Sequence, residues 1–350
     1  MVHPGLIGFG PFFSSQLSLE ELQSSLVGRA VADRGRGLLV QFPDGVHPVV
    51  VPGRLRAEGG VLPVVGDFVV ASPGPDRTVT RVLERRTWLS RNVAGGATAE
   101  QVLAANVDVV FIVQGLDEGP NARRLERTLA AVHAGGAEPV IVLTKPDRAE
   151  ELGAALAEAR AAAPAVDVEL ASGLTGQGVS ALAARLRPDR TGVLVGPSGA
   201  GKSTLTNALL GREAQRTAPV RASDDRGVHT TSGRELFPLP GGGALVDGPG
   251  IRELRLWDAS GLDATFEDLA TVAARCRFRD CSHGAEPGCA VREAIADGRL
   301  DAARVESYRK LALELARQAE RREGGAARAE RARWKAVSKE LRRLSRGRRS

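Results

Sequence analysis

Apolar and polar positions follow two different patterns along the chain, and the change falls near residue 92. Residues 28–91 contain short apolar segments separated by turns rich in Gly, Pro and Asp. Five short strands in about sixty residues predict a small β-barrel, most simply an OB-fold, with an SH3-like barrel or a small sandwich as alternatives. The segments are GRAVADR, GLLVQF, PVVVPGRL, GDFVVASP and TVTRVLER.

The predicted barrel contains no obvious row of aromatic residues on which nucleic-acid bases would stack. We therefore expect Phe68 and Trp88 to lie in the core. Any contact with RNA is expected to run through phosphates and to use the arginines of this segment, namely Arg34, Arg36, Arg54 and Arg56.

Beyond a link at 92–101, continuous apolar strands alternate with helical segments. The strands are predicted at 107–114, 139–144, 166–172 and 192–196, and the helices at 122–136, 149–162 and 178–186. Continuous apolar strands are typical of parallel sheets, and their alternation with helices predicts an α/β domain with helices on both faces.

Composition and charge narrow the class of protein. The chain has 350 residues, 43% of them hydrophobic, and its longest apolar runs are too short to span a bilayer. Its start lacks a basic region and is interrupted by Gly and Pro, so we do not expect a secretory signal. Three cysteines are an odd number, which favours a reducing cytoplasm over a disulfide framework. We expect a cytoplasmic protein with no membrane partner.

The basic residues are concentrated at the C-terminal end. Residues 321–350 contain twelve Arg and Lys and three Glu, a net charge of +9, whereas the rest of the chain has a net charge of −3. Such a tail is either a solvated disordered segment or a contact for nucleic-acid phosphates.

A complete phosphate-binding loop, GPSGAGKS, follows the strand predicted at 192–196 and precedes a helical segment. Backbone N–H groups of such a loop surround phosphates, its lysine reaches the β- and γ-phosphates, and its serine binds Mg²⁺. The candidate GTP-binding residues here are Gly196, Pro197, Ser198, Gly199, Ala200, Gly201, Lys202, Ser203 and Thr204, and Ser203 is also a candidate Mg²⁺ ligand.

Two later segments complete the expected phosphate site. Asp247 ends an apolar strand and is followed by Pro249 and Gly250, so it is a candidate Mg²⁺ ligand, and Gly250 can approach the γ-phosphate. Between them, GVHTTSG contains Thr230 and Thr231, either of which is a candidate to close over Mg²⁺ or to be an exposed loop residue.

An earlier apolar strand ends in Thr144, Lys145, Pro146 and Asp147. A carboxylate at Asp147 can accept hydrogen bonds from N1–H and the exocyclic amine of guanine, whereas adenine would leave it unpaired. The stem of Lys145 can lie along the base. Ser172, in the loop ASGLTG, stands where a backbone contact to the guanine oxygen is expected.

These elements occur in the order base-reading, phosphate loop and switch regions, whereas most GTPases begin with the phosphate loop. The termini of a domain often lie close together, so joining them and opening the chain elsewhere preserves the packed core. The order therefore indicates a circularly permuted GTPase domain.

Every cysteine of the chain lies within fourteen positions that also contain a histidine. Three thiolates and one imidazole match a closed structural Zn²⁺ site, which has no open position for catalysis. The alternative, three structural cysteines without metal, does not explain why none occurs elsewhere. The candidate zinc ligands are Cys276, Cys281, His283 and Cys289.

Residues 28 to at least 320 resemble the circularly permuted GTPases that act late in assembly of the small ribosomal subunit. The resemblance includes GDFVVA, AANVDVVFIV, GPSGAGKSTLTNALLG, GVHTTSGRELFPLPGGGALVDGPGIRE and CRFRDCSHGAEPGCAVREAI. The chain departs from the usual family pattern, which has Asn at Thr144 and Thr at Gly248 and often a third threonine at Ser232.

The resemblance implies a multidomain fold with an N-terminal β-barrel (OB-fold), a circularly permuted α/β P-loop GTPase domain and a C-terminal helical zinc-binding module. It implies as partners GTP, GDP, the small ribosomal subunit and its 16S rRNA, and as cofactors Mg²⁺ and one structural Zn²⁺. We expect a monomer divided into an extension at 1–27, the barrel at 28–92, the GTPase domain at 93–270, the zinc module at 271–320 and the basic tail at 321–350.

The sequence has no glutamine at the position where Ras-type enzymes orient the attacking water. Ras-type enzymes orient the attacking water with a Gln after Asp-x-x-Gly, but here that position is Ile251, so slow hydrolysis stimulated by the subunit is expected. His229 is the nearest polar candidate for a catalytic role, and it can equally be a loop packing residue. A metabolic P-loop kinase and an RNA-binding protein with a vestigial nucleotide site are the rival functions.

Overall fold

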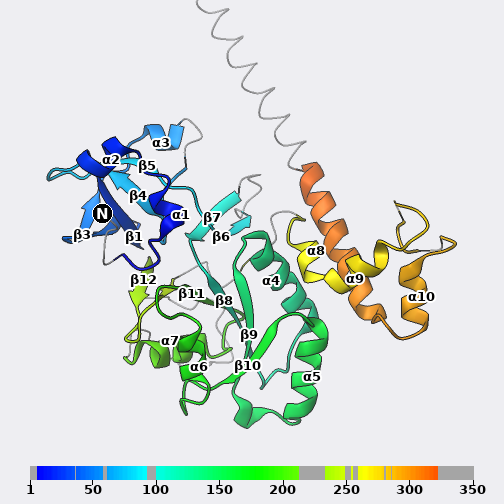
Figure 1. Cartoon of the computed structure of the whole chain (residues 1–350). Coiled ribbons are helices and arrows are strands. Elements are labelled where there is room, and N and C mark those ends of the chain that lie inside the picture. Colours follow the sequence, from blue (N-terminus) through cyan, green and yellow to red (C-terminus); the bar gives the residue numbers. More distant parts are fainter. Residues whose placement is uncertain are drawn as a thin grey trace, which may run out of the picture.

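Three bodies follow one another along the chain in Figure 1: a β-barrel, a central α/β core and a helical C-terminal module. This computed structural model describes residues 6–35, 37–57, 61–92, 100–212, 233–248, 254, 259–279, 281–284 and 286–321. Within these ranges no helix combines the length and apolarity needed to cross a bilayer.

The barrel contains five strands, paired antiparallel in the order β3-β2-β1-β4-β5. A parallel bridge from Val50 to Thr78 joins the two ends of this row, so the sheet closes on itself around Val40, Phe42 and Val69. The strands are β1 (Leu26–Asp33), β2 (Leu38–Phe42), β3 (Gly45–Val49), β4 (Phe68–Ala71) and β5 (Val79–Val82).

The third strand begins earlier than the pattern predicted. A two-residue turn after Phe42 returns the chain at once, so β3 ends at Val49 and the short helix α3 (Arg54–Ala57) follows. The expectation of a strand at 48–55 was therefore wrong over most of its length. A turn defined by two residues sets the register of a hairpin more strongly than the apolar content of the next segment.

Phe68 is buried as expected, but Trp88 is 37% exposed and its indole N–H donates to Glu100 at 3.3 Å. Trp88 opens a hairpin of β6 (Trp88–Asn92) and β7 (Glu100–Ala105), whose two strands flank the link expected at 92–101 and overlap its ends. The segment before the barrel forms α1 (Pro11–Ser14) and α2 (Leu19–Ser24), and Phe13 packs on Phe68 with ring centres 4.3 Å apart.

The α/β core is a twisted sheet in the order β10-β9-β8-β11-β13-β12, parallel except for β12. Its strands are β8 (Val109–Gly115), β9 (Glu138–Thr144), β10 (Asp167–Ala171), β11 (Thr191–Val195), β12 (Arg234–Pro238) and β13 (Ala244–Asp247).

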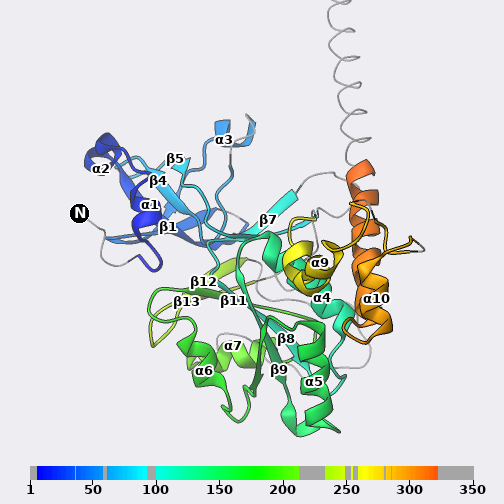
Figure 2. The same cartoon turned by 45° about the vertical axis from the view of Figure 1, so that its right-hand side comes forward.

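Side chains of successive strand residues point to opposite faces, so the central strands contribute to two cores. One face packs on α4 (Ala122–Ala134) and α5 (Leu152–Ala162), and the other on α6 (Val179–Ala184) and α7 (Lys202–Leu210). Figures 1 and 2 show the two helix layers on either side of the sheet. This arrangement is the one predicted from the alternation of strands and helices.

The barrel and the core share one sheet of eleven strands, because the end of β1 pairs antiparallel with β12. The paired residues are Ala32 with Glu235 and Asp33 with Arg234. Since β12 also pairs with β13, a hydrogen-bonded path runs from the barrel to Asp247.

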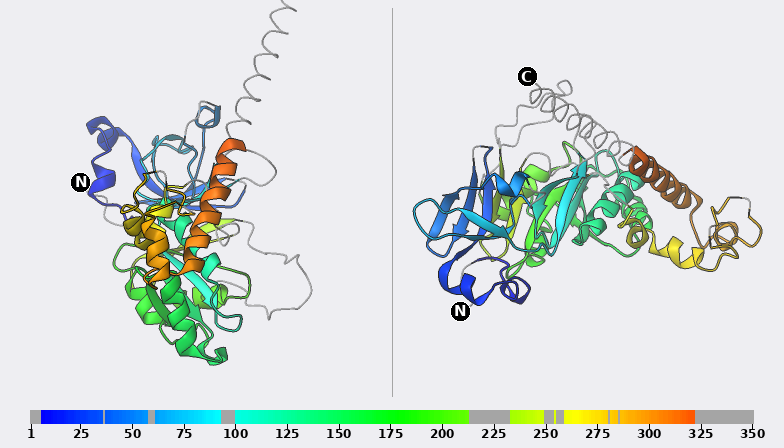
Figure 3. Two further views of the ribbon diagram at one scale, coloured as in Figure 1. Left: turned by 90° about the vertical axis from the view of Figure 1, so that its right-hand side faces the viewer. Right: turned by 90° about the horizontal axis from the view of Figure 1, so that it is seen from above.

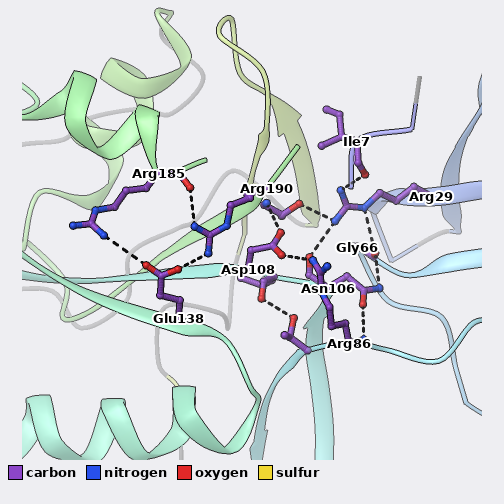
Figure 4. A network of polar contacts seen from close by, with 12 residues as sticks. Ile7, Arg29, Gly66, Arg86, Asn106, Asp108, Glu138, Arg185 and Arg190 are labelled. Carbon is purple, nitrogen blue, oxygen red and sulfur yellow. Dashed lines mark hydrogen bonds and ion pairs between the residues drawn. The ribbon is translucent and has the colours of Figure 1, made fainter. Parts of the chain in front are cut away.

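A buried arginine fixes this junction (Figure 4). The Arg29 guanidinium on β1 is 2% exposed and donates to the carbonyls of Ile7, Gly66 and Asn106 and to the Thr191 hydroxyl at 2.7–3.3 Å. Burial lowers the pKa of Arg29 to about 10, and the charges of nearby Asp108 and Asp67 oppose the shift. The guanidinium therefore stays charged at neutral pH and requires all of these acceptors.

The C-terminal module lies on the side of the core away from the barrel (Figure 3). It contains α8 (Leu262–Thr265), α9 (Glu267–Ala273), α10 (Ala290–Ala296) and a helix over 302–321. Arg304, 7% exposed, donates to Glu126 on α4, to Asp268 on α9 and to the carbonyls of Ala162 and Thr265. A second buried arginine thus fastens this module to the core.

We predict that Arg29→Met lowers the free energy of unfolding by about 3 kcal/mol, because it leaves several buried acceptors without a donor. Urea denaturation measures this change. Arg34→Met, at an arginine whose side chain is 63% exposed and pairs with Glu235 at 3.4 Å, is the matched control and is expected to change it by less than about 0.5 kcal/mol. Equal effects of the two substitutions would contradict the role assigned to Arg29.

Candidate nucleotide site and metal cluster

The phosphate loop connects the buried strand β11 to α7, and residues 196–201 form the turn between them. Lys202, the first residue of α7, is 7% exposed. Its ammonium donates to the carbonyl of Gly196 at 2.8 Å and to that of Pro197. The lysine therefore curls over its own loop, where phosphate oxygens can replace the carbonyls as its partners.

The segment of residues 144–147 touches this loop although about fifty residues separate the two in sequence. Thr144, the last residue of β9, donates its hydroxyl to the Ala200 carbonyl at 2.6 Å, with the Gln114 carbonyl at 3.2 Å. Thr144 replaces the usual Asn of the family pattern, and its hydroxyl still links the two motifs. Beyond it, Lys145 has a left-handed backbone and Asp147 lies exposed in a 3₁₀ turn, Pro146–Arg148.

The loop after β10 lies against the same helix. Ser172 is 5% exposed, and its hydroxyl accepts from the backbone N–H of Thr175 at 3.3 Å. A side chain at Gly173 would place Cβ 2.6 Å from the backbone of Thr204 on α7, so glycine permits this close approach. The Ser172 loop, the Thr144–Asp147 segment and the phosphate loop are thus packed together as one site.

The two described candidate Mg²⁺ ligands follow neighbouring strands. Ser203 lies in the first turn of α7 after β11, and Asp247 is the last residue of β13 and is 9% exposed. Because β11 and β13 are parallel and adjacent, both residues lie at the same edge of the sheet. The other candidates, His229, Thr230, Thr231 and Gly250, lie outside the described residues.

Three polar residues of this site were not singled out from the sequence. Asp117, in the loop after β8, forms an ion pair with Lys145 at 2.5 Å, and this hydrogen bond is the main cause that lowers the pKa of Asp117. The buried Gln114 accepts from the backbone N–H of Asn121, which caps α4 through the N–H of Arg124. A single acidic residue in a turn belongs to no motif of fixed spacing, so the sequence gives no signal that would identify Asp117.

The metal-ligand candidates meet between α9 and α10. The three sulfur atoms and a ring nitrogen of Cys276, Cys281, His283 and Cys289 all lie within 4.8 Å of one another. The Nδ1 atom of His283 is 3.5 Å from Sγ of Cys276 and 3.7 Å from Sγ of Cys289. Bond lengths of about 2.0–2.3 Å to a tetrahedral zinc place neighbouring ligand atoms about 3.6 Å apart, so the cluster fits this ion.

The surroundings of the histidine favour metal binding as well. Burial, together with the charge of Arg309, lowers the pKa of His283 and so favours the neutral imidazole, which is the form that binds metals. Cys289 is 3% exposed and directly precedes α10, and Cys276 and Cys281 pack against the apolar core of the module. A metal here would join the ends of two short helices.

Known proteins resemble this chain over most of its length. A family model described as RsgA GTPase matches residues 82–257. The "Small ribosomal subunit biogenesis GTPase RsgA" of Opitutus terrae is 42% identical over 347 residues, 95% of each chain. The protein of the same name from Methanosarcina acetivorans is 44% identical over 305 residues, 84% of this chain and 83% of its own.

Two solved structures share the fold. YjeQ from Thermotoga maritima has a TM-score of 0.63 and 24% identity and covers 83% of this chain and 99% of its own. YloQ, described as a circularly permuted GTPase, has a TM-score of 0.61 and 23% identity and covers 84% of this chain and 96% of its own. The circular permutation inferred from motif order is thereby confirmed.

We predict that Thr144→Val, which keeps the shape and removes the hydroxyl, destabilises the phosphate loop by about 1–2 kcal/mol, because the Ala200 carbonyl loses its donor. The expected result is weaker GTP binding, measured by calorimetric titration. Thr128→Val removes a hydroxyl that bonds to the carbonyl of Arg124 near the surface of α4, and it should leave GTP affinity unchanged. Unchanged GTP affinity in Thr144→Val would show that the contact does not support the site.

Proposed function

Because this chain belongs to the RsgA GTPase family, we propose that it hydrolyses GTP in late biogenesis of the small ribosomal subunit. Relatives named for that function align with 84–95% of this chain. We propose further that it acts in the cytoplasm and that subunit contact accelerates an intrinsically slow hydrolysis.

The observation that carries the proposal is the contact of Thr144 with the Ala200 carbonyl. It brings Asp147 and the phosphate loop into one site, which suits a single nucleotide whose base and phosphates are held at the two ends. In this proposal the Asp147 carboxylate accepts from N1–H and the amine of guanine, and Ser172 lies at the guanine oxygen. Selectivity for guanine also disfavours the rival function, a metabolic P-loop kinase.

The roles at the phosphate end follow from the chemistry of the side chains. Lys202 neutralises the β- and γ-phosphates, and Ser203 and Asp247 hold Mg²⁺, with Thr230 or Thr231 as a further ligand. The ion would stabilise the charge that develops on the transferred phosphoryl group. Since Ile251 cannot orient water, we assign that role to His229, in an arrangement that the ribosomal subunit completes.

The two outer modules have features that suit RNA. The row β3-β2-β1-β4-β5, closed by the parallel bridge, supports the OB-fold interpretation of the barrel. In the C-terminal module, Arg275, Arg277 and Arg279 are exposed around Phe278, which is 41% exposed and 5.5 Å from the Arg277 guanidinium. Cationic and aromatic side chains together can hold phosphates and an unpaired base. We propose 16S rRNA as the partner of both modules.

We propose Zn²⁺ as the metal of the cysteine–histidine cluster. Three thiolates and one imidazole make a closed set of soft ligands, which is typical of structural zinc. The ion would hold the loop of Arg277 and Phe278 in one conformation. We propose the domain division expected from the sequence with two boundaries moved, because the one at 27/28 falls inside β1 and the one at 270/271 falls inside α9. In this proposal the barrel begins at Leu26, and the zinc module begins with α8, which packs in the same apolar cluster as Cys289.

GTP hydrolysis by the purified protein should rise at least about tenfold on addition of purified small ribosomal subunits, because the subunit completes the catalytic arrangement. Phosphate release at saturating GTP is the measurement. Large subunits serve as the matched control, and Lys202→Ala should remove the stimulated rate. Equal rates with small subunits, large subunits and buffer would contradict the proposed function.

Protein purified without added metal should contain one zinc per chain, and Cys289→Ser should lose it, because the cluster would keep only three ligands. Elemental analysis measures the metal, and limited proteolysis should show faster cleavage of the C-terminal module. Ser282→Ala, in the same loop but outside the ligand set, should retain zinc. Folded wild-type protein without zinc would refute the assignment.

A further inference from the structure

The ion pair of Asp117 and Lys145 lies at the base-reading end of the nucleotide site. The two residues follow neighbouring parallel strands, β8 and β9, whose last residues Gly115 and Thr144 are paired in register. The Lys145 ammonium lies 2.5 Å from Oδ2 of Asp117, and the two side chains are 23% and 28% exposed. The pair therefore spans the ends of both strands where the site opens to solvent.

The backbone around the pair is held at both ends. The N–H of Leu116 donates to the carbonyl of Thr144 at 2.9 Å, and the N–H of Arg148 donates to that of Lys145 at 3.0 Å. Lys145 has φ 57° and ψ 50°, a left-handed conformation that residues with a side chain rarely adopt. Such a conformation persists only where the surroundings define it, and it sets the direction in which the lysine stem leaves the strand.

Space for the pair depends on Gly115. A Cβ atom at this position would lie 2.4 Å from Oδ1 of Asp117 and 3.5 Å from the Lys145 ammonium. The hydrogen bond from Lys145 also lowers the pKa of Asp117, because it stabilises the charged carboxylate. The absence of a side chain at Gly115 thus leaves room for the pair.

We propose that Asp117 is a positioning residue for guanine nucleotide binding, because its carboxylate holds the Lys145 stem in place as one wall of the base pocket. The inference rests on the proposed assignment of Lys145 and Asp147 to guanine. A lysine side chain loses considerable rotamer freedom when a ligand orders it. Asp117 removes that loss beforehand, and a preorganised wall binds the base more tightly.

A structural role predicts a different result from a positioning role. A partly exposed ion pair contributes little to folding stability, so Asp117→Ala should leave the thermal midpoint almost unchanged. The affinity for GTP should instead fall about tenfold, the size expected for ordering one long side chain. The KM for GTP should rise while kcat at saturation is retained, because bound nucleotide still meets an intact phosphate loop.

The choice of nucleotide can also distinguish the contact of Lys145 with the face of the base from the hydrogen bonds of Asp147 to its edge. Inosine triphosphate lacks the exocyclic amine that Asp147 is proposed to bind, so the ratio of GTP to inosine triphosphate affinity reports on the edge. Asp117→Ala should weaken both nucleotides equally and leave this ratio unchanged. A changed ratio would overturn the assignment of Asp117 to the wall.

The experiment is a double-mutant cycle on the full chain, with GTP affinity measured for Asp117→Ala, Lys145→Ala and the double variant. We expect the double variant to bind GTP no more weakly than Lys145→Ala, because Asp117 acts through Lys145. Asp117→Asn, which keeps an acceptor oxygen without the charge, should give an intermediate affinity. Asp297→Ala is the matched control, since Asp297 forms an exposed ion pair with Arg299 at 2.8 Å on the C-terminal module.

Two further outcomes overturn the proposal: unchanged GTP affinity in Asp117→Ala, or losses that simply add in the double variant. Failure of the underlying guanine assignment is recognised separately. Asp147→Asn exchanges an acceptor for a donor and should shift preference from GTP to xanthosine triphosphate. If that shift occurs while Asp117→Ala binds GTP normally, only the positioning role is wrong, and if it does not occur, the base-reading assignment fails with it.

Discussion

A single buried charge sets the relation between the barrel and the GTPase core. Moving a guanidinium out of water is costly unless each of its donors finds an acceptor. The acceptors of Arg29 come from the N-terminal segment, the barrel, the segment before β8 and β11. These parts must therefore adopt one arrangement together, and in that arrangement the end of β1 also pairs with β12.

A second buried arginine has the same role at the opposite side of the core, where Arg304 joins α4 to the C-terminal module. The two outer modules are thus attached to elements that begin or end at the nucleotide site. Strand β12 leads through β13 to Asp247, and α4 begins shortly after Asp117. A nucleotide that moves either element would shift a module rigidly, because buried charged contacts permit few alternatives.

The binding motifs could be predicted from the sequence, whereas the pairing of strands far apart in the chain could not. The phosphate loop, the Asp147 segment and the cysteine–histidine cluster have fixed spacings because their ligands demand fixed geometry. The continuous sheet depends on Ala32 meeting Glu235, and nothing in the periodicity of either segment specifies that partner. The exposure of Trp88 and the pairing of Asp117 likewise depend on neighbours that only the folded chain brings near.

The shared sheet also imposes an order on how the molecule is completed during its own synthesis. Residue 32 leaves the ribosome long before residue 235, and at about 5–20 residues per second the interval is on the order of ten seconds or more. Until then the end of β1 is an open strand edge, which can pair with a foreign strand. Over most of the same period the Arg29 guanidinium has no contact with Thr191, because Thr191 has not yet been synthesised. The seam between barrel and core therefore closes late in translation, and slow elongation would prolong its exposure to aggregation.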